Sequence, residues 1–320
     1  MMPTYDVVVP SAGRPCLTAL LDALDTSRGP RPDRVLVVDD RPRPDGPLPL
    51  GRAAGTVEVW RGPARGPAAA RNVGWRAATA PWVAFLDDDV VPGPTWAADL
   101  VADLAGARPD VAGVAARLSV PLPAGRRPTD WERNVAGLES GRWVTADLAF
   151  RRTALASIGG FDDRFRRAYR EDADLAARLL AAGWRFETGR RSSEHPVRPA
   201  DRWVSIRLQA GNADDPRLRL RYGRRWREIT GVHKGRRSRH LVVTAAGALA
   251  VAAGAARRPA VARAAAVAWA AGTAELAWAR IAPGPRTPDE VATMVATSVA
   301  IPPAATWHWL RGWAGLAAGR

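Results

Sequence analysis

An apolar stretch that runs directly into three acidic residues constrains the fold of this chain most strongly. Residues Trp82–Leu86 have the length and composition of a buried strand, and Asp87, Asp88 and Asp89 follow without a break. No Lys or Arg lies in this run to neutralise the carboxylates, so a bound cation would stabilise them. Hard oxygen ligands suit Mg²⁺ or Mn²⁺. The alternative is a solvated acidic turn that caps the next helix.

Apolar strands alternate with helical stretches over the first half of the chain. Strands are predicted at Tyr5–Val9, Val35–Val38, Val57–Trp60, Trp82–Leu86, Val111–Val120, Trp143–Phe150 and Trp184–Phe186. Helices are predicted from Pro15 through Leu24 and at Ala64–Ala78, Thr95–Leu104 and Thr153–Ile158. This alternation indicates an α/β fold with a mainly parallel sheet covered by helices on both faces.

The first, second and fourth strands each end in polar or special residues. Pro10–Ser11, Asp39–Asp40 and Asp87–Asp89 follow them directly. Ligands bind parallel sheets beyond the carboxyl ends of the strands, so we expect these groups to meet in one crevice. No Gly-x-Gly-x-x-Gly motif and no Gly-Lys-Ser/Thr phosphate loop is present. A nucleotide would therefore be held by carboxylates and a metal ion.

Composition narrows the possible partners and chemistry. The formal net charge of +15 over 320 residues favours anionic partners such as phosphates or an acidic membrane surface. The single cysteine, Cys16, excludes an internal disulfide framework and a cysteine-based zinc site. The first residues carry no basic-then-apolar signal, so we expect a cytoplasmic protein, at the inner face of the cell membrane if its C-terminal helices bind there.

A second acidic segment and a histidine follow the predicted sheet. Asp172 falls in the first turn of a predicted helix that begins near Arg170. Acids are favoured at that position by the helix dipole, which is a purely structural explanation for Asp172. His195 lies in the loop after the last strand. It is either a further metal ligand or an ordinary surface histidine.

The order of these motifs resembles the family 2 glycosyltransferases of GT-A fold, over roughly residues 4–200. The pieces that carry the resemblance are Val7–Pro10, Val37–Asp40, Ala70–Gly74, Phe85–Asp89 and Gly160–Asp162 together with Glu171–Leu175. One departure is Asp147, where many members carry Asn. The Gln-x-x-Arg-Trp motif of processive synthases is also missing, which favours a single transfer over polymerisation.

The resemblance implies an enzyme that moves a sugar from a nucleotide-diphosphate sugar to an acceptor hydroxyl, with inversion and with Mn²⁺ or Mg²⁺. The implied donor-binding residues are Pro10, Asp39, Asp40, Arg71 and Asp88. Asp40 would bind the nucleobase, with Asp39 beside it, Asp88 would reach the ribose, and Arg71 would support the nucleotide end. The implied metal ligands are Asp87, Asp89 and His195, and the implied general base is Asp172.

The last third of the chain differs in character. Residues 201–239 form a basic connecting segment, and 240–320 form an Ala-rich extension with helices predicted at Leu241–Ala256, Ala260–Ile281 and Val291–Ile301. The sixteen-residue run Leu241–Ala256 is short for a membrane span, which needs about 17 to 25 residues. One interpretation is a hairpin packed on the catalytic domain. The other is a membrane-associated hairpin flanked by Arg and Trp, near a lipid-linked or saccharide acceptor of cell-envelope synthesis.

Two other classes fit part of the pattern. A sugar-phosphate nucleotidyltransferase would share the fold type, but the loop Pro10–Arg14 lacks the lysine that such enzymes carry. A basic nucleic-acid-binding protein would explain the charge, but acids at consecutive strand ends would repel phosphate without a metal. We therefore expect no nucleic-acid partner, and a catalytic domain at residues 1–200.

Overall fold

The computed structural model describes residues 2–318 and divides the chain into two compact units. The first comprises Met1–Pro121 and Ala136–Val197, and the second comprises Leu122–Val135 and Arg198–Arg320. All motifs of the predicted catalytic domain lie in the first unit. The sequence did not indicate that residues 122–135 would group with the C-terminal part.

Within residues 2–318, the first unit is built on an eight-stranded sheet of order β3-β2-β1-β4-β7-β6-β8-β5. The strands are β1 Tyr5–Ser11, β2 Arg34–Asp39, β3 Glu58–Arg61, β4 Trp82–Leu86, β5 Val91–Pro92, β6 Val111–Ser119, β7 Asp147–Arg151 and β8 Arg185–Glu194. The neighbours β3, β2, β1 and β4 are parallel. β7 pairs antiparallel with both β4 and β6, which makes the sheet mixed. The expected sheet flanked by helices is thus confirmed, with an antiparallel insertion.

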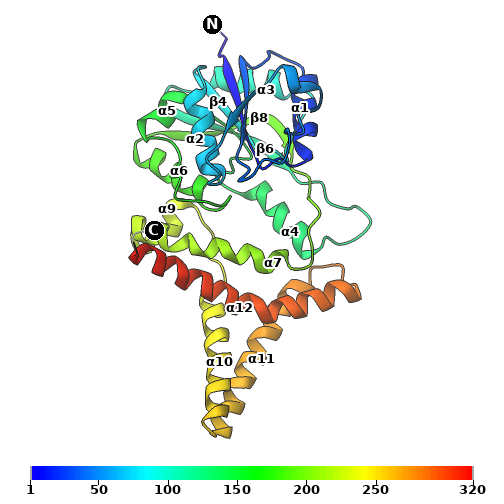
Figure 1. Ribbon diagram of the computed structural model, residues 1–320, viewed down its shortest axis with the longest axis vertical. Helices are drawn as coiled ribbons and strands as arrows, with labels where there is room; N and C mark the ends of the chain where they lie inside the picture. The colour runs from blue at the N-terminus through cyan, green and yellow to red at the C-terminus, as the bar shows by residue number, and fades with distance from the viewer. Residues whose placement is uncertain (1, 319–320) are drawn as a thin grey trace. The chain divides into compact units, whose positions relative to one another are not determined.

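Helices cover both faces of this sheet (Figure 1). The helices of this unit are α1 Cys16–Thr26, α2 Pro67–Ala77, α3 Trp96–Gly106, α5 Arg152–Ser157 and α6 Glu171–Ala181. Successive β1 residues point to opposite faces: Val7 and Val9 join the core under α1 and α3, while Val8 joins the core under α2, α5 and α6. The continuous apolar pattern of these strands follows from this two-sided burial. Leu180, which the apolar spacing of α6 would place in the core beside Leu175 and Leu179, is instead 40% exposed.

The start of α2 is fixed by a glycine and a proline. Gly66 has a φ of 95°, and a Cβ there would collide with the backbone of Arg166. Pro67 then occupies the first helical turn, where its missing N–H costs no hydrogen bond. The helix predicted from Ala64 therefore begins at Pro67, and this start orients Arg71 and Asn72 one turn later.

The second unit is helical. Its helices are α4 Asp130–Ala136, α7 Val204–Arg207, α8 Asp215–Tyr222, α9 Trp226–Thr230, α10 Arg237–Ala255, α11 Pro259–Ile281 and α12 Pro288–Ala317. Short 3₁₀ turns occupy Gly51–Gly55 and Gly137–Ser140 in the first unit, and Leu208–Ala213 and Gly223–Arg225 in the second. α10 and α11 lie side by side as a hairpin, and α12 packs against both (Figure 1).

The segment 122–135 contacts the rest of the helical unit through a buried arginine, Arg280. Arg280 of α11 donates to Asp130 Oδ2 at 2.8 Å and to Thr297 Oγ1 at 2.7 Å. Arg133 in turn donates to the backbone oxygen of Arg280 at 2.7 Å. These bonds join three elements of the second unit, which explains why this segment belongs to it.

The end predicted for the last helix is wrong. The pair Pro302–Pro303 was expected to terminate it near Ile301, but α12 continues to Ala317. Each proline removes one backbone donor and commonly kinks a helix without ending it. Ile301, Pro302 and Ala305 are buried, so their packing compensates for the lost hydrogen bonds.

α10 is apolar yet poorly covered by the rest of its unit. Within residues 2–318 it is the one helix that is long and apolar enough to cross a membrane, judged by length and composition only. Only 11% of its apolar 18-residue stretch is buried. A core helix of comparable composition would be mostly buried. Instead, Val242, Leu249 and Val251 are 68%, 52% and 76% exposed.

Candidate active site

The ends of β1 and β4 meet around Asp88. Ser11 Oγ donates to Asp88 Oδ2 at 2.9 Å, and the backbone N–H of Ala12 donates to the same oxygen at 3.2 Å. Arg14 donates to Asp88 Oδ1 at 2.8 Å. The predicted convergence of these two strand ends is therefore confirmed. Both oxygens of Asp88 are engaged by the loop after β1, so its predicted contact with a ribose remains a prediction that requires Arg14 or this loop to give way.

Asp39, the last residue of β2, and Asp40, which follows it, contact different neighbours. Asp39 pairs with Arg41 at 2.8 Å, and hydrogen bonds from Arg41 hold the pKa of Asp39 below its usual value. Asp40 accepts backbone hydrogen bonds from Ala64 and Gly66, each at 2.7 Å. Asp40 thus fixes the loop that leads into α2. The predicted contacts of Asp39 and Asp40 with a nucleobase remain predictions.

Pro10 lies in the buried part of β1, opposite Val38 of β2. Its predicted place beside the donor remains a prediction.

Arg71 is the buried centre of the site. Its guanidinium donates to Asp87 Oδ1 at 2.6 Å and to Glu171 Oε1 at 3.0 Å, and its side chain is 1% exposed. The ring of Phe161 lies 5.5 Å from the guanidinium carbon, in range of a cation–π interaction. Arg71 therefore connects the end of β4 to the start of α6. Its predicted contact with the nucleotide remains a prediction; the contacts present make it a positioning residue.

The acidic pair at the start of α6 has an unusual protonation equilibrium. Burial, with a smaller contribution from the negative charge of Asp172, raises the pKa of Glu171 to about 8. Within residues 2–318, Glu171 Oε2 has no hydrogen-bond partner. Burial also raises the pKa of Asp172, against the opposing effect of its hydrogen bond from Ala173 N–H. A carboxylate with a raised pKa is a stronger base once it is ionised.

Asp89 and His195 meet at the other side of the acidic run. His195 Nε2 lies 3.5 Å from Asp89 Oδ1, and both residues are buried. Within the described residues, His195 Nδ1 is buried without a hydrogen-bond partner. His195 is therefore not the solvated loop histidine of the alternative interpretation. An imidazole beside a hard carboxylate oxygen is a donor set that suits Mn²⁺ or Mg²⁺ if substrate oxygens complete the coordination.

The full set of predicted ligands is not gathered on one spot. Across residues 2–318, no group of three or more His, Cys, Asp or Glu side chains could hold a metal ion. Asp87 is turned to Arg71, whereas Asp89 is close to His195. A divalent ion would thus have two protein ligands here. Phosphate oxygens of the donor and water molecules would complete the coordination shell of the ion.

Asp147 has a role that the sequence did not reveal. It is buried and accepts hydrogen bonds from Trp96 Nε1 at 2.6 Å, Ser193 Oγ at 2.6 Å and Arg191 Nε at 3.0 Å. The network joins α3, β7 and β8, and β8 carries the chain to His195. Asp147 therefore holds β8, at Ser193 two residues before His195, against β7 and α3. The acidic side chain inside an apolar strand indicated that Asp147 needs buried partners. The identity of those partners could not be predicted, because they are distant in the sequence.

Asn72 is a second residue that sequence reasoning left without a role. Its amide donates to the backbone oxygen of Phe161 at 2.8 Å and accepts from the Phe161 N–H at 2.9 Å. It also accepts from Trp75 Nε1 at 2.9 Å. Asn72 thus docks the turn before α6 onto α2, beside the contacts that Arg71 makes.

The sheet order and the acids at its strand ends define a GT-A fold, and a solved structure supports this class. A crystal structure of GalNAc-T7 with UDP, GalNAc and Mn²⁺ aligns at a TM-score of 0.50 and 15% identity, over 72% of this chain and 55% of that chain. A UDP complex of S. aureus TarS aligns at a TM-score of 0.48 and 16% identity, over 86% of this chain and 91% of that chain, and no argument rests on it. At these identities the likeness concerns the fold alone.

Residues 1–158 match the family described as glycosyl transferase family 2, and through its N-terminal unit the chain belongs to that family. Pre-mycofactocin glycosyltransferases from two strains of Mycobacterium tuberculosis, CDC 1551 / Oshkosh and ATCC 25618 / H37Rv, are 37% identical to it over 145 residues. That match covers 41% of this chain and spans 30% of the relatives' own length. The family match ends before Glu171 and Asp172.

Proposed function

We propose that the N-terminal unit transfers a sugar from a nucleoside diphosphate sugar to an acceptor hydroxyl, with inversion at the anomeric carbon. The observation that carries this proposal is the bridge through Arg71. In a family 2 fold, this arginine holds Asp87 of the acidic strand end and Glu171 of the α6 acidic pair with one guanidinium. The same arrangement favours sugar transfer over the nucleotidyltransferase and nucleic-acid-binding alternatives.

Asp172 acts as the general base in this proposal. It takes the proton from the acceptor hydroxyl while the acceptor oxygen forms its bond to the anomeric carbon. The bond from that carbon to the diphosphate oxygen breaks, and the nucleoside diphosphate leaves with the electron pair. The raised pKa of Asp172 suits a base that works near neutral pH. Arg71 and Asn72 keep this base at a fixed place relative to the acidic strand end.

Asp89 and His195 would hold a divalent ion beside the diphosphate. When bound, such an ion neutralises the charge that builds on the leaving group. GalNAc-T7 was crystallised with UDP and Mn²⁺, which makes uridine nucleotides with Mn²⁺ the first combination to test. Pro10, Asp39, Asp40 and Asp88 would line the donor site, with Arg14 released from Asp88 as the donor enters.

The experiment is donor binding by calorimetry, with nucleoside diphosphate sugars of several bases in Mn²⁺, Mg²⁺ or EDTA. We expect one donor class to bind, and Asp89→Ala and His195→Ala each to weaken that binding at least tenfold in the presence of the metal. Asp25→Ala, which removes an exposed surface acid, is the control. Donor binding that is equally tight in EDTA and in both variants would overturn the metal assignment. Failure of every donor to bind would overturn the proposed function.

The helical unit favours a membrane-associated acceptor. Apolar side chains of α10 are exposed along its length, and α11 adds exposed Val261, Val267 and Trp278. We propose that the α10–α11 hairpin enters the membrane boundary and brings the enzyme to a lipid-linked acceptor of cell-envelope glycan or glycolipid synthesis. Arg257 and Arg258 lie at the turn between the helices, where their charges can reach lipid headgroups.

A further inference from the structure

A cationic cavity in the helical unit has no part in the sugar transfer proposed above. It has a volume of about 420 Å³ and lies among α8, α9, the loop before α10, and α12. Its wall contains four basic side chains, Arg219, Arg227, Lys234 and Arg237, and two tryptophans, Trp309 and Trp313. All of these residues belong to the second unit.

The positive charge of this cavity is only partly balanced. Asp215 lies 3.7 Å from Arg227 and 3.8 Å from Arg237, which is too far for hydrogen bonds. Among the described residues, Arg219 and Lys234 form no ion pair. An anion in the cavity would therefore meet two cations, Arg219 and Lys234, that no described carboxylate neutralises.

Hydrogen-bond donors in the cavity wall are also unused. Arg237 Nη1 and Trp309 Nε1 are buried and have no hydrogen-bond partner within residues 2–318. α10 begins at Arg237 without a side-chain cap, so the N–H groups of its first turn add further donors and the positive end of the helix dipole. Buried donors are normally satisfied, and a phosphate group offers the acceptors they lack.

The apolar part of the cavity wall indicates what is attached to the anion. Leu241 lines the cavity one turn into α10, and the exposed Val242, Leu249 and Val251 continue along the same helix. The indole rings of Trp309 and Trp313 pack edge to face with centroids 6.3 Å apart. Tryptophan and a cluster of basic residues beside an apolar helix are typical of a lipid headgroup region.

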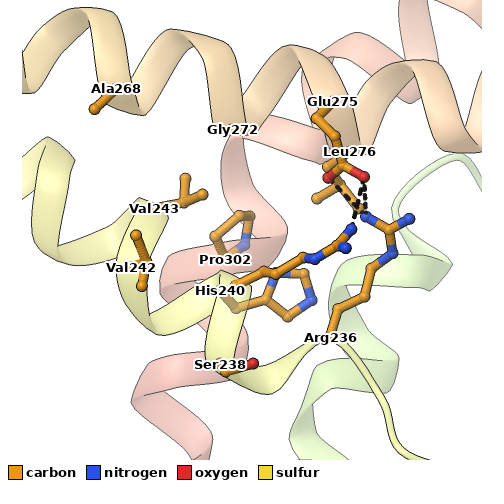
Figure 2. A pocket seen from close by; sticks show the side chains of 11 residues that line it. Arg236, Ser238, His240, Val242, Val243, Ala268, Gly272, Glu275, Leu276 and Pro302 are labelled. Atoms are coloured by element: carbon orange, nitrogen blue, oxygen red, sulfur yellow. Dashed lines mark hydrogen bonds and ion pairs between the residues drawn. The ribbon is translucent and has the colours of Figure 1, made fainter.

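We propose that this cavity binds the phosphate group of an anionic phospholipid, with the acyl chains following α10. The proposal rests on the membrane association of the hairpin proposed above. A neighbouring cavity of about 460 Å³, which shares Ser238, is a weaker candidate (Figure 2). There Arg236 and Arg239 are each already paired with Glu275 at 2.8 Å.

The test is sedimentation of the full chain with vesicles of phosphatidylcholine alone or with phosphatidylglycerol. We expect the wild-type chain to prefer vesicles with phosphatidylglycerol. Arg219→Gln with Arg237→Gln should reduce that preference on the order of twentyfold, which is the effect of about two cations at a lipid surface. Lys234→Gln, at an exposed position, should reduce it about fivefold and keeps the test valid if the double variant fails to fold.

The control is Arg224→Gln with Arg225→Gln, which removes the same charge from the same basic segment outside the cavity. An equal loss of preference in the control would overturn the site and leave general electrostatic attraction. Equal binding of the wild-type chain to both vesicle types would overturn the site but not the membrane-associated hairpin. No binding to either would overturn both. Thermal stabilisation by inorganic pyrophosphate that depends on Arg219 and Arg237, without any vesicle preference, would identify a soluble phosphate ligand and overturn the lipid.

Discussion

Arg71 shows how strongly one side chain constrains this site. It is buried, and its guanidinium joins the partly exposed Asp87 to the buried Glu171. The resemblance to family 2 glycosyltransferases suggested a direct nucleotide contact, and the structure gives Arg71 a second function that the motif alone does not contain. Its partners, Asp87 and Glu171, lie 16 and 100 positions away in the sequence. Such pairings depend on the tertiary fold and cannot be predicted from local patterns.

Removing the proposed base should separate binding from chemistry. Asp172→Asn is nearly isosteric but cannot accept a proton, so turnover should fall by about 10² to 10⁴ while donor affinity stays within a few-fold. Steady-state kinetics and donor calorimetry on the same preparations measure both effects. Asp163→Asn, which alters a partly exposed acid paired with Arg65, is the control. Unchanged turnover of Asp172→Asn would make Glu171 the next candidate.

The raised pKa of Glu171 predicts a specific dependence of stability on pH. The folded chain binds the Glu171 proton up to about pH 8, whereas the unfolded chain releases it near the ordinary value of 4.5. The unfolded state therefore holds fewer protons within this window, and stability falls as the pH rises through it. Glu171→Gln mimics the protonated form and should show a smaller fall between pH 5 and 8 in urea unfolding. Parallel pH profiles of the two proteins would show that Glu171 is ionised in the fold.

At the level of helices and strands, the sequence predicted best those elements whose residues are buried on both sides. β1, β2 and β4 were predicted to within two residues at either end, because an unbroken apolar run identifies a central parallel strand. β8 was predicted at Trp184–Phe186 but extends to Glu194, since alternate residues of its second half are polar and exposed. The reach of α12 beyond its prolines was missed, because its packing partners are elsewhere in the chain.

The Asp147 network makes a testable contribution to the central sheet. Asp147→Ala leaves the buried guanidinium of Arg191 with only the more distant carboxylate of Asp103, 3.6 Å away, and frees three hydrogen-bond donors. Breaking a buried pair in this way costs about 3 to 5 kcal/mol, so the free energy of unfolding should fall by that amount in urea titrations. Asp110→Ala, which removes an exposed acid of the same unit, should change it by less than about 1 kcal/mol. Equal effects of the two variants would contradict this role of Asp147.

At the level of the whole molecule, the chain divides its chemistry and its exposed apolar surface between two units. The acids that the sequence analysis selected all lie in the first unit, and the exposed apolar hairpin lies in the second. From the motif positions, the sequence analysis expected a catalytic domain at residues 1–200 and an extension after it. It did not predict that residues 122–135 would group with the second unit, because that depends on the contacts of Arg280 with Asp130.

The exposed surface of α10 predicts how the chain partitions. Replacing Val242, Leu249 and Val251 together by Gln should abolish most binding to neutral vesicles without unfolding the chain, because all three are exposed. The matched control replaces Leu208, Leu220 and Ile229 by Gln, three exposed apolar residues on short helices of the same unit. Flotation assays with circular dichroism measure both properties. If both triple variants bind vesicles equally, the hairpin is not the membrane contact.

The bridge through Arg71 also limits how this chain can be recombined with its relatives. One guanidinium holds Asp87 and Glu171, and the adjacent Asn72 holds the turn at Phe161. A chimera that takes the acidic strand end from one parent and the α6 segment from another inherits two halves of a single ion-pair network. Crossover points for directed evolution should therefore lie before Gly66 or after Ala181, so that α2, β4 and α6 come from the same parent.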